Sequence, residues 1–263
     1  MDKIKTIIQK EWAEVFKNRM VLFSIIFMPL LFAVIPLIML GTFNQTGGAE
    51  DLSGEMPAQF TNMCPEGLSG GECFQVYMVS QFTLLFMMLP LIIPINIAAY
   101  SIVGEKTTRS LEPLLATPIT TAELLIGKTL AAVIPAVGAT LGGFLIYAVG
   151  ALILADNPQV ARSLLDPMWL LAVLWVGPLL AILSVNFAIL VSSRVNDPRV
   201  AEQLSAVVIV PLLAVFFGQI SGLFLVDSRF ILITGLGLLI IDIGMVQMGV
   251  RLFQRETILT RWK

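Results

Sequence analysis

Apolar residues gather into six long runs along the chain, separated by short segments that hold nearly all the charged residues. A helix that crosses the hydrocarbon core of a bilayer needs about 20 mainly apolar residues. Each run meets this length, so the pattern predicts an all-α membrane protein with a single transmembrane domain over residues 1–263. The six predicted spans are Met20–Leu40, Tyr77–Val103, Leu130–Leu154, Met168–Val191, Leu204–Val226 and Phe230–Val250.

The segment before the first span, residues 1–19, has an amphipathic pattern. One helical face carries Ile4, Ile7, Ile8, Trp12, Val15 and Phe16, and the lysines lie off it. Such a pattern favours a helix that lies in the membrane interface with Trp12 at headgroup depth. The alternative is a cytoplasmic tail whose charges serve only to set the topology.

Basic residues are distributed unevenly between the two sides of the predicted membrane. Fourteen of the sixteen Lys and Arg residues fall on the side of the two termini, whereas the other side has two, beside eight acidic residues. Cytoplasmic segments carry the excess of Lys and Arg. We therefore expect a multi-pass protein of the plasma (inner) membrane with both termini in the cytoplasm.

Composition excludes several kinds of function. The chain is 57% hydrophobic and 13% charged, and it contains no histidine. The lack of histidine excludes Ser–His–Asp hydrolysis and His-ligated zinc centres, so no catalytic residue and no metal site is predicted. No basic aromatic patch indicates a nucleic-acid partner.

The first outer connection, residues 42–76, is long, acidic and rich in glycine, and it contains both cysteines of the chain. On the oxidising side of a membrane two such cysteines favour a disulfide. We predict a structural Cys64–Cys73 bond that closes a small loop. Two thiols without histidine make a poor metal site.

The connection between the second and third spans, residues 104–124, divides into two parts. Residues 105–115 can form a short helix, and Pro118 then breaks the chain. Thr120 and Glu123 form a capping-box pattern, which predicts a new helix that runs into the third span. The result is a charged elbow at the cytoplasmic face.

This elbow resembles a known family signature. Its sequence, Glu-Lys-x-x-x-Ser-Leu-Glu-Pro-Leu-Leu-Ala-Thr-Pro from Glu105, is followed by Glu-Leu-Leu-x-Gly-Lys from Glu123. Both are similar to the permease subunits of type-2 ABC exporters. The C-terminal residues 252–263 and the Ser193–Arg199 segment resemble the sodium-efflux-like branch of that family, and the likeness extends over the whole chain.

The resemblance implies a type V ABC exporter fold with two six-span subunits, a homodimer or two related chains, held by two ATPase subunits. The elbow then corresponds to a coupling helix that docks on the ATPase, with contacts from Glu105, Lys106, Arg109, Leu111, Glu112 and Pro113. ATP and Mg belong to the partner. Gly127-Lys128-Thr129 imitates the end of a phosphate-binding loop, but Ala122 stands where that loop needs glycine.

Four polar residues in the spans are candidates for a transport pathway. Asp242 is the one acidic residue inside a predicted span, and Gln219, Asn186 and Asn96 are further candidates. Membrane-embedded acids are functional candidates by default, although interhelical hydrogen bonding is the commoner use of polar side chains. Asp242 therefore has either a transport role or a structural one.

We expect the transmembrane subunit of an ATP-driven exporter that works by alternating access and binds no cofactor itself. The alternative is a stand-alone ion-coupled carrier or channel, which would need several membrane-embedded charges or an internal repeat. A third possibility, an intramembrane enzyme, lacks histidine and paired acids. The sequence does not distinguish whether the transported substrate is a cation, a lipid, a peptide or a drug.

Overall fold

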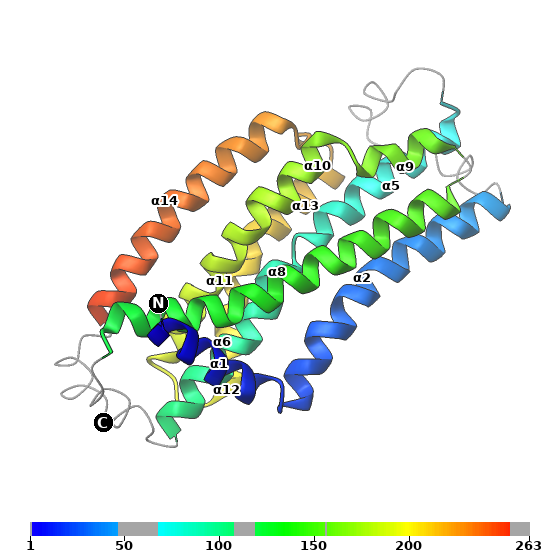
Figure 1. The fold of residues 1–263 in the computed structure, drawn as a ribbon. Helices are drawn as coiled ribbons and strands as arrows, with labels where there is room; N and C mark the ends of the chain where they lie inside the picture. Colours follow the sequence, from blue (N-terminus) through cyan, green and yellow to red (C-terminus); the bar gives the residue numbers. More distant parts are fainter. Residues whose placement is uncertain (1, 47–67, 108–118, 156, 253–263) are drawn as a thin grey trace.

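The computed structural model describes residues 2–46, 68–107, 119–155 and 157–252. The regular elements of this part of the chain are all helices, joined by short turns and loops, and it contains no strand (Figure 1). Its elements are α1 (Asp2–Val15), α2 (Arg19–Thr46), α5 (Gly70–Phe86), α6 (Leu89–Thr107), α8 (Thr121–Leu154), α9 (Pro158–Leu164), α10 (Pro167–Leu171), the π-helical turn η2 (Ala172–Val176), α11 (Gly177–Ser192), α12 (Pro198–Ser205), the 3₁₀ turn η3 (Ala206–Ile209), α13 (Val210–Ile220) and α14 (Ser228–Leu252).

Six helical segments of the described chain are long and apolar enough to cross a membrane, which confirms the predicted number. They are α2, α5 with α6, α8, α10 to α11, α12 to α13, and α14. In a bilayer, a helix satisfies every backbone polar group within its own segment. The chain is therefore a multi-pass membrane protein.

Several spans begin or end at other residues than the sequence predicted, and two of these ends have a clear local cause. The second span begins at Gly70 rather than Tyr77, because Ser69 caps it: the Ser69 Oγ accepts the N–H of Glu72 at 3.2 Å, and the Glu72 carboxylate accepts the N–H of Ser69 at 2.7 Å. The fifth span ends at Ile220 rather than Val226, where Gly222 takes a positive φ of 71° that favours glycine.

Some prolines interrupt the spans and others do not. Pro90 follows the break between α5 and α6 at Met87 and Met88, Pro178 follows the π-helical turn, and Pro211 follows the 3₁₀ turn. A proline has no N–H to continue the ladder, so irregular turns gather just before it. Pro135, by contrast, lies inside the continuous helix α8.

The α5–α6 span forms the interior of the bundle. α6 packs against α8 and α11, while α2 lies along α8 and α14 lies along α11. Phe86 at the end of α5 stacks on Tyr147 of α8, with ring centroids 6.0 Å apart. The apolar side chains of α13 and α14 are largely exposed, as expected for helices that face lipid or a second membrane subunit.

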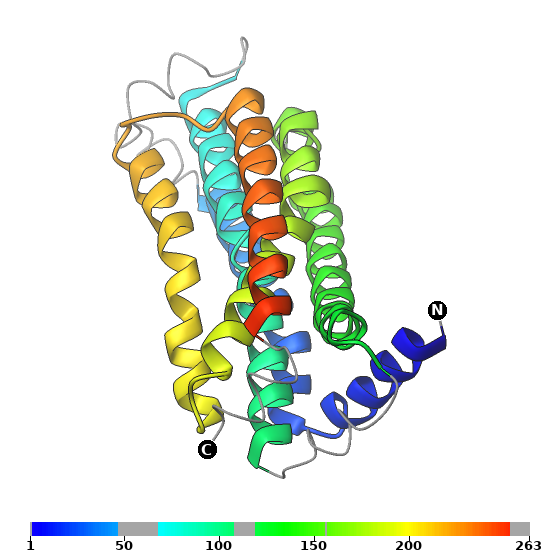
Figure 2. The same ribbon diagram turned by 90° about the vertical axis from the view of Figure 1, so that its left-hand side faces the viewer.

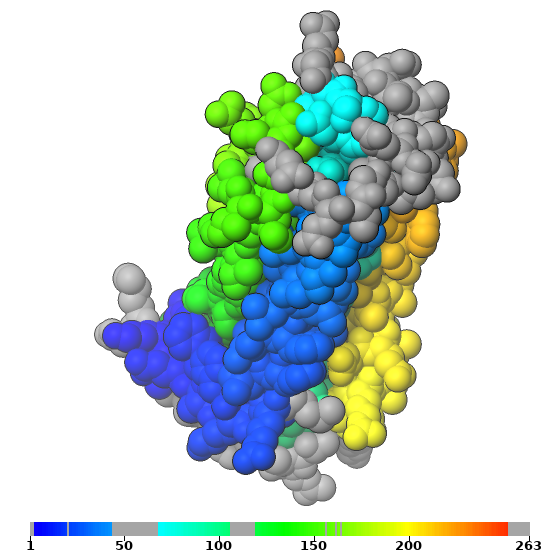
Figure 3. All heavy atoms as spheres, turned by 90° about the vertical axis from the view of Figure 1, so that its right-hand side faces the viewer, coloured from blue at the N-terminus to red at the C-terminus, as the bar shows by residue number. Residues whose placement is uncertain are grey.

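The bundle has two distinct ends. α1 lies across one end at an angle to the long helices (Figure 2), and in Figure 3 it projects beside the lower part of α2. We call this the α1 end. The opposite end carries α9, the start of α10 and the connection from α13 to α14, and we call it the α9 end.

Candidate functional site

Close packing holds α1 against α8 at the α1 end. Ile7 is buried, and a Cβ placed on Gly127 would lie 2.8 Å from the Ile7 Cγ2, so only glycine permits this approach. The indole Nε1–H of Trp12 donates to the carbonyl of Ala131 at 2.9 Å. Two helices distant in sequence are thereby fixed in one geometry.

Beside this contact lies a buried set of charges, the ion cluster, formed by Lys10, Glu11, Ser101, Glu105 and Lys128. The Lys128 Nζ lies 2.8 Å from both the Glu11 Oε1 and the Glu105 Oε2, and all three side chains are buried. Lys10 forms an ion pair with Glu105 and lies 3.7 Å from Glu11. The two lysines balance the two carboxylates.

Ser101 closes the network. Its hydroxyl donates to the Glu11 Oε2 at 2.5 Å and accepts from the Lys128 Nζ at 2.7 Å. Residues of α1, α6 and α8 thus meet in one hydrogen-bonded group. Buried charges are tolerated when they are paired and hydrogen-bonded in this way.

The pKa values of the α1 members follow from these contacts. Burial raises the pKa of the Glu11 carboxyl, but the charge and hydrogen bond of Lys128 and the Ser101 hydroxyl outweigh it, so the net shift is downward. Burial likewise opposes the charged form of Lys10, yet the Glu105 carboxylate raises its pKa above the ordinary value. Glu11 and Lys10 are therefore charged at neutral pH.

The predicted coupling residues are only partly visible. Glu105 lies in the ion cluster, with its carboxylate directed to lysines of this chain. Lys106 lies in the last turn of α6, and its side chain is outside the described part of the structure. The other four, Arg109, Leu111, Glu112 and Pro113, are outside the described residues, so their contact with an ATPase stays a prediction.

Sequence reasoning missed Glu11 and Lys128 as members of one site. A signal for Glu11 was present: it lies four residues after Ile7 and four before Val15, on the face that α1 buries. An acid on an apolar stripe indicates a buried partner. No sequence pattern identified that partner, because Lys128 is 117 residues away.

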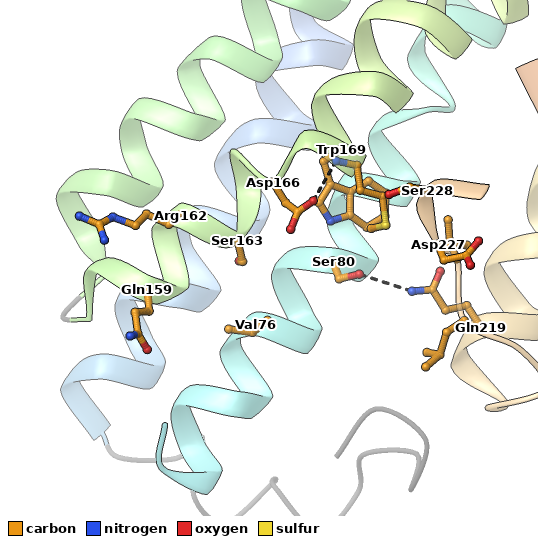
Figure 4. A pocket seen from close by; sticks show the side chains of 13 residues that line it. Val76, Ser80, Gln159, Arg162, Ser163, Asp166, Trp169, Gln219, Asp227 and Ser228 are labelled. Carbon is orange, nitrogen blue, oxygen red and sulfur yellow. Dashed lines mark hydrogen bonds between the residues drawn. The ribbon is translucent and has the colours of Figure 1, made fainter. Parts of the chain in front are cut away.

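A cavity of about 550 Å³ lies at the α9 end, between α5, α9, α10, α13 and the start of α14 (Figure 4). Its charged lining residues are Arg162, Asp166 and Asp227. Gln219 of α13 reaches across to Ser80 of α5, and its Nε2 donates to the Ser80 Oγ at 3.4 Å. The Gln219 Oε1 is buried without a hydrogen-bond partner among the described residues. We call this space the polar cavity.

A second cavity, of about 250 Å³, lies deeper in the bundle between α5, α6, α11, α13 and α14. Its walls are almost entirely apolar, and Trp169 and Val226 line both this space and the polar cavity. The two cavities therefore adjoin. We call the second one the apolar cavity.

The structure does not bring the four pathway candidates together. Gln219 lines the polar cavity, while Asn186 lines a separate space of about 160 Å³ between α8, α11 and α14. Asn96 is half-buried on α6, outside both of these spaces. Asp242 is buried on α14, and neither carboxylate oxygen has a hydrogen-bond partner in the described parts of the chain.

The predicted disulfide falls partly outside the described residues. Cys73 is buried in α5 beside Phe74 and Tyr77, whereas Cys64 is not described. The Cys64–Cys73 bond therefore stays a prediction. Within residues 2–46, 68–107, 119–155 and 157–252, no group of three or more acidic or cysteine side chains could hold a metal ion.

The described chain thus combines six membrane-spanning helices, a transverse α1 and internal cavities, as a membrane transport protein does. Comparison with known families gives a finer assignment: residues 5–241 match the model of the ABC-2 family transporter protein. The chain belongs to this family, and it is a transmembrane permease component rather than the catalytic one. No curated protein matches the chain.

Proposed function

We propose that this chain is the transmembrane subunit of an ATP-binding-cassette exporter that moves its substrate out across the plasma membrane. Two copies of a separate ATPase subunit bind ATP and Mg and drive alternating access in this chain and a second permease subunit, identical or related. Membership of the ABC-2 family supports this assignment. The large exposed apolar faces of α13 and α14 are suitable for a second permease or lipid.

The observation that carries the proposal is the position of the ion cluster. Glu105 and Lys128 stand on either side of segment 108–118, which holds most of the predicted coupling residues. Their ion pair ties the end of α6 to the start of α8, and Glu11 ties both helices to α1. A force applied to this segment would therefore act on α1, α6 and α8 together.

The charge distribution supports the orientation of the chain in the membrane. Under the positive-inside rule the α1 end faces the cytoplasm, where the ATPase and its ATP are found. The polar cavity then opens on the outer side. The resemblance of residues 252–263 to the sodium-efflux-like branch stays a prediction, and all of this segment after Leu252 lies outside the described residues.

Co-purification with an ATPase tests the proposal. Tagged wild-type chain is expected to retain a Walker-motif ATPase, and the charge reversals Arg109→Glu and Glu112→Lys are expected to abolish its retention. Arg162→Glu at the α9 end is the matched control and should leave the complex intact. Stable transport by the purified chain with no ATPase present would contradict the proposal and favour a stand-alone carrier.

A further inference from the structure

The polar cavity offers hydrogen-bond acceptors that the described residues do not use. Gln219 is almost fully buried, at 2% exposed, and its Oε1 has no partner among them. A buried acceptor left unpaired destabilises the structure that contains it. A ligand that donates a hydrogen bond from within the cavity would remove this destabilisation.

Two carboxylates add negative charge to the same walls. Asp166 caps α10 by accepting the N–H of Met168 at 2.8 Å, and Asp227 accepts the N–H of Phe230 at 2.7 Å at the start of α14. Each bond uses the Oδ1 and leaves the Oδ2 without a hydrogen bond to the described residues. Arg162 lines the cavity too, but its guanidinium points away from Asp166 (Figure 4).

The apolar cavity is a neighbour of the polar cavity, because Trp169 and Val226 line both. A molecule with its polar head in one cavity and its apolar body in the other would lie against Trp169. The indole face also attracts cations. Carboxylates, an amide oxygen and an aromatic ring all favour a positively charged donor.

We propose that the polar and apolar cavities together bind amphipathic cations, which carry a positively charged group with N–H donors on an apolar body. An N–H of this group donates to the Gln219 Oε1 and the positive charge lies in the field of Asp166 and Asp227, while the apolar body fills the space beyond Trp169. An anionic amphiphile would meet two carboxylates, and a neutral one would gain nothing from them. That such cations are transported rests on the proposed function; that they bind does not.

Equilibrium binding of rhodamine 6G tests the site. This lipophilic cation carries N–H donors, and its fluorescence anisotropy can be titrated with the full chain in lipid nanodiscs without nucleotide. Gln219→Leu is expected to weaken binding about tenfold, a difference of about 1.4 kcal/mol. Gln219→Glu adds a charge in the same volume and is expected to tighten it.

The carboxylates are tested by Asp166→Asn with Asp227→Asn, which keep the helix caps because Asn caps as well as Asp. This pair is expected to weaken rhodamine 6G binding about tenfold or more and to remove its salt dependence. Asp197→Asn, at the N-cap of α12 outside both cavities, is the matched control and should bind as wild type. Leu212→Trp is expected to block the apolar cavity, whereas Leu223→Trp, at an exposed position, should not.

Neutral Nile red separates charge recognition from simple partitioning. The proposal is overturned if Nile red binds as tightly as rhodamine 6G, or if the Asn and Gln219 variants bind rhodamine 6G as wild type does. ATP-driven export of rhodamine 6G is measured separately with the ATPase complex. Binding without ATP-driven export would contradict the proposed exporter function but would still support the proposed binding site.

Discussion

Lys128 carries most of the electrostatic balance at the α1 end, since its ammonium group lies 2.8 Å from both the Glu11 and Glu105 carboxylates. Taking these groups out of water is costly, and their mutual attraction offsets that cost only while all of them are present. The main effect of the ion cluster is therefore to hold α1, α6 and α8 in one geometry, and its net contribution to stability is small. Removing one member leaves buried charge without compensation.

Lys128→Met is accordingly expected to lower the free energy of unfolding by about 3–5 kcal/mol, the usual cost of breaking a buried ion pair. Denaturant titration in mixed micelles measures it. Lys3→Met is the matched control: Lys3 lies 3.8 Å from Glu123 with half of its side chain exposed, and the loss should stay below about 1 kcal/mol. Equal effects of the two changes would contradict the buried pairing.

Glu11 predicts an acid-sensitive component of stability. The pKa of Glu11 in the folded protein is lower than the ordinary value of 4.5. Its contribution to the free energy of unfolding is therefore complete at pH values above 4.5 and is lost as the pH falls through the lowered pKa. The free energy of unfolding should therefore decrease with acid below that pH. Glu11→Gln is expected to flatten this decrease.

Glu14→Gln provides the control for that pH profile. Glu14 is on the same helix and lies 3.7 Å from Lys10, but its side chain is 58% exposed. Exposed pairs contribute little. Glu14→Gln should therefore keep the decrease in the free energy of unfolding at acid pH. If Glu11→Gln shows the same decrease as wild type, Glu11 is not its cause.

At the scale of elements, the docking of α1 on α8 depends on one glycine. Gly127→Ala puts a methyl group about where the Ile7 side chain lies, because the added Cβ would be 2.8 Å from the Ile7 Cγ2. Overpacking of this kind costs about 1–3 kcal/mol. The variant is expected to lose that much stability and to expose α1 to proteolysis.

Two further variants make this test specific. Ile7→Ala combined with Gly127→Ala should recover part of the loss, since the first change vacates the space that the second fills. Gly138→Ala on the same helix has no neighbouring atom within 4 Å of the added Cβ and should be neutral or slightly stabilising. Destabilisation by Gly138→Ala as large as that by Gly127→Ala would argue against a contact-specific effect.

Helix ends with local signals were predictable. The Thr120–Glu123 pattern predicts a capping box, and the structure confirms it: the Thr120 N–H donates to the Glu123 carboxylate at 2.8 Å, and α8 begins at Thr121. Ser69 and Glu72 carry the same signal at the start of α5, where the prediction started the span too late. Caps are predictable because both partners lie within four residues.

At the scale of the whole molecule, Asp242 is an acid in the membrane span α14 without a hydrogen-bond partner in the described chain. Asp242→Leu is expected to raise the free energy of unfolding of the isolated chain by about 1–3 kcal/mol, because it removes a buried group whose hydrogen bonds are unmade. Gln247→Leu, an exposed polar position on the same helix, should change it by less than about 0.5 kcal/mol.

Transport by Asp242→Asn separates the two roles that the sequence left open. Wild-type transport in this variant would assign Asp242 to structure or assembly, whereas loss of transport with an unchanged fold would place it in the mechanism. A destabilised Asp242→Leu chain would instead show that the carboxylate has a partner. Denaturant titration and ATP-driven substrate flux supply both measurements.

The sequence by itself determined the number of spans, the all-helical class and the excess of Lys and Arg on the side of the two termini. These depend on local length, hydropathy and charge, because a membrane helix must satisfy its backbone within its own segment. Only the tertiary structure showed that Lys128 forms an ion pair with Glu11 and that Gln219 lines the same cavity as Asp227. It also showed that Asp242 has no hydrogen-bond partner among the described residues. Contacts of this kind depend on how helices far apart in the sequence pack together, which no local pattern of residues specifies.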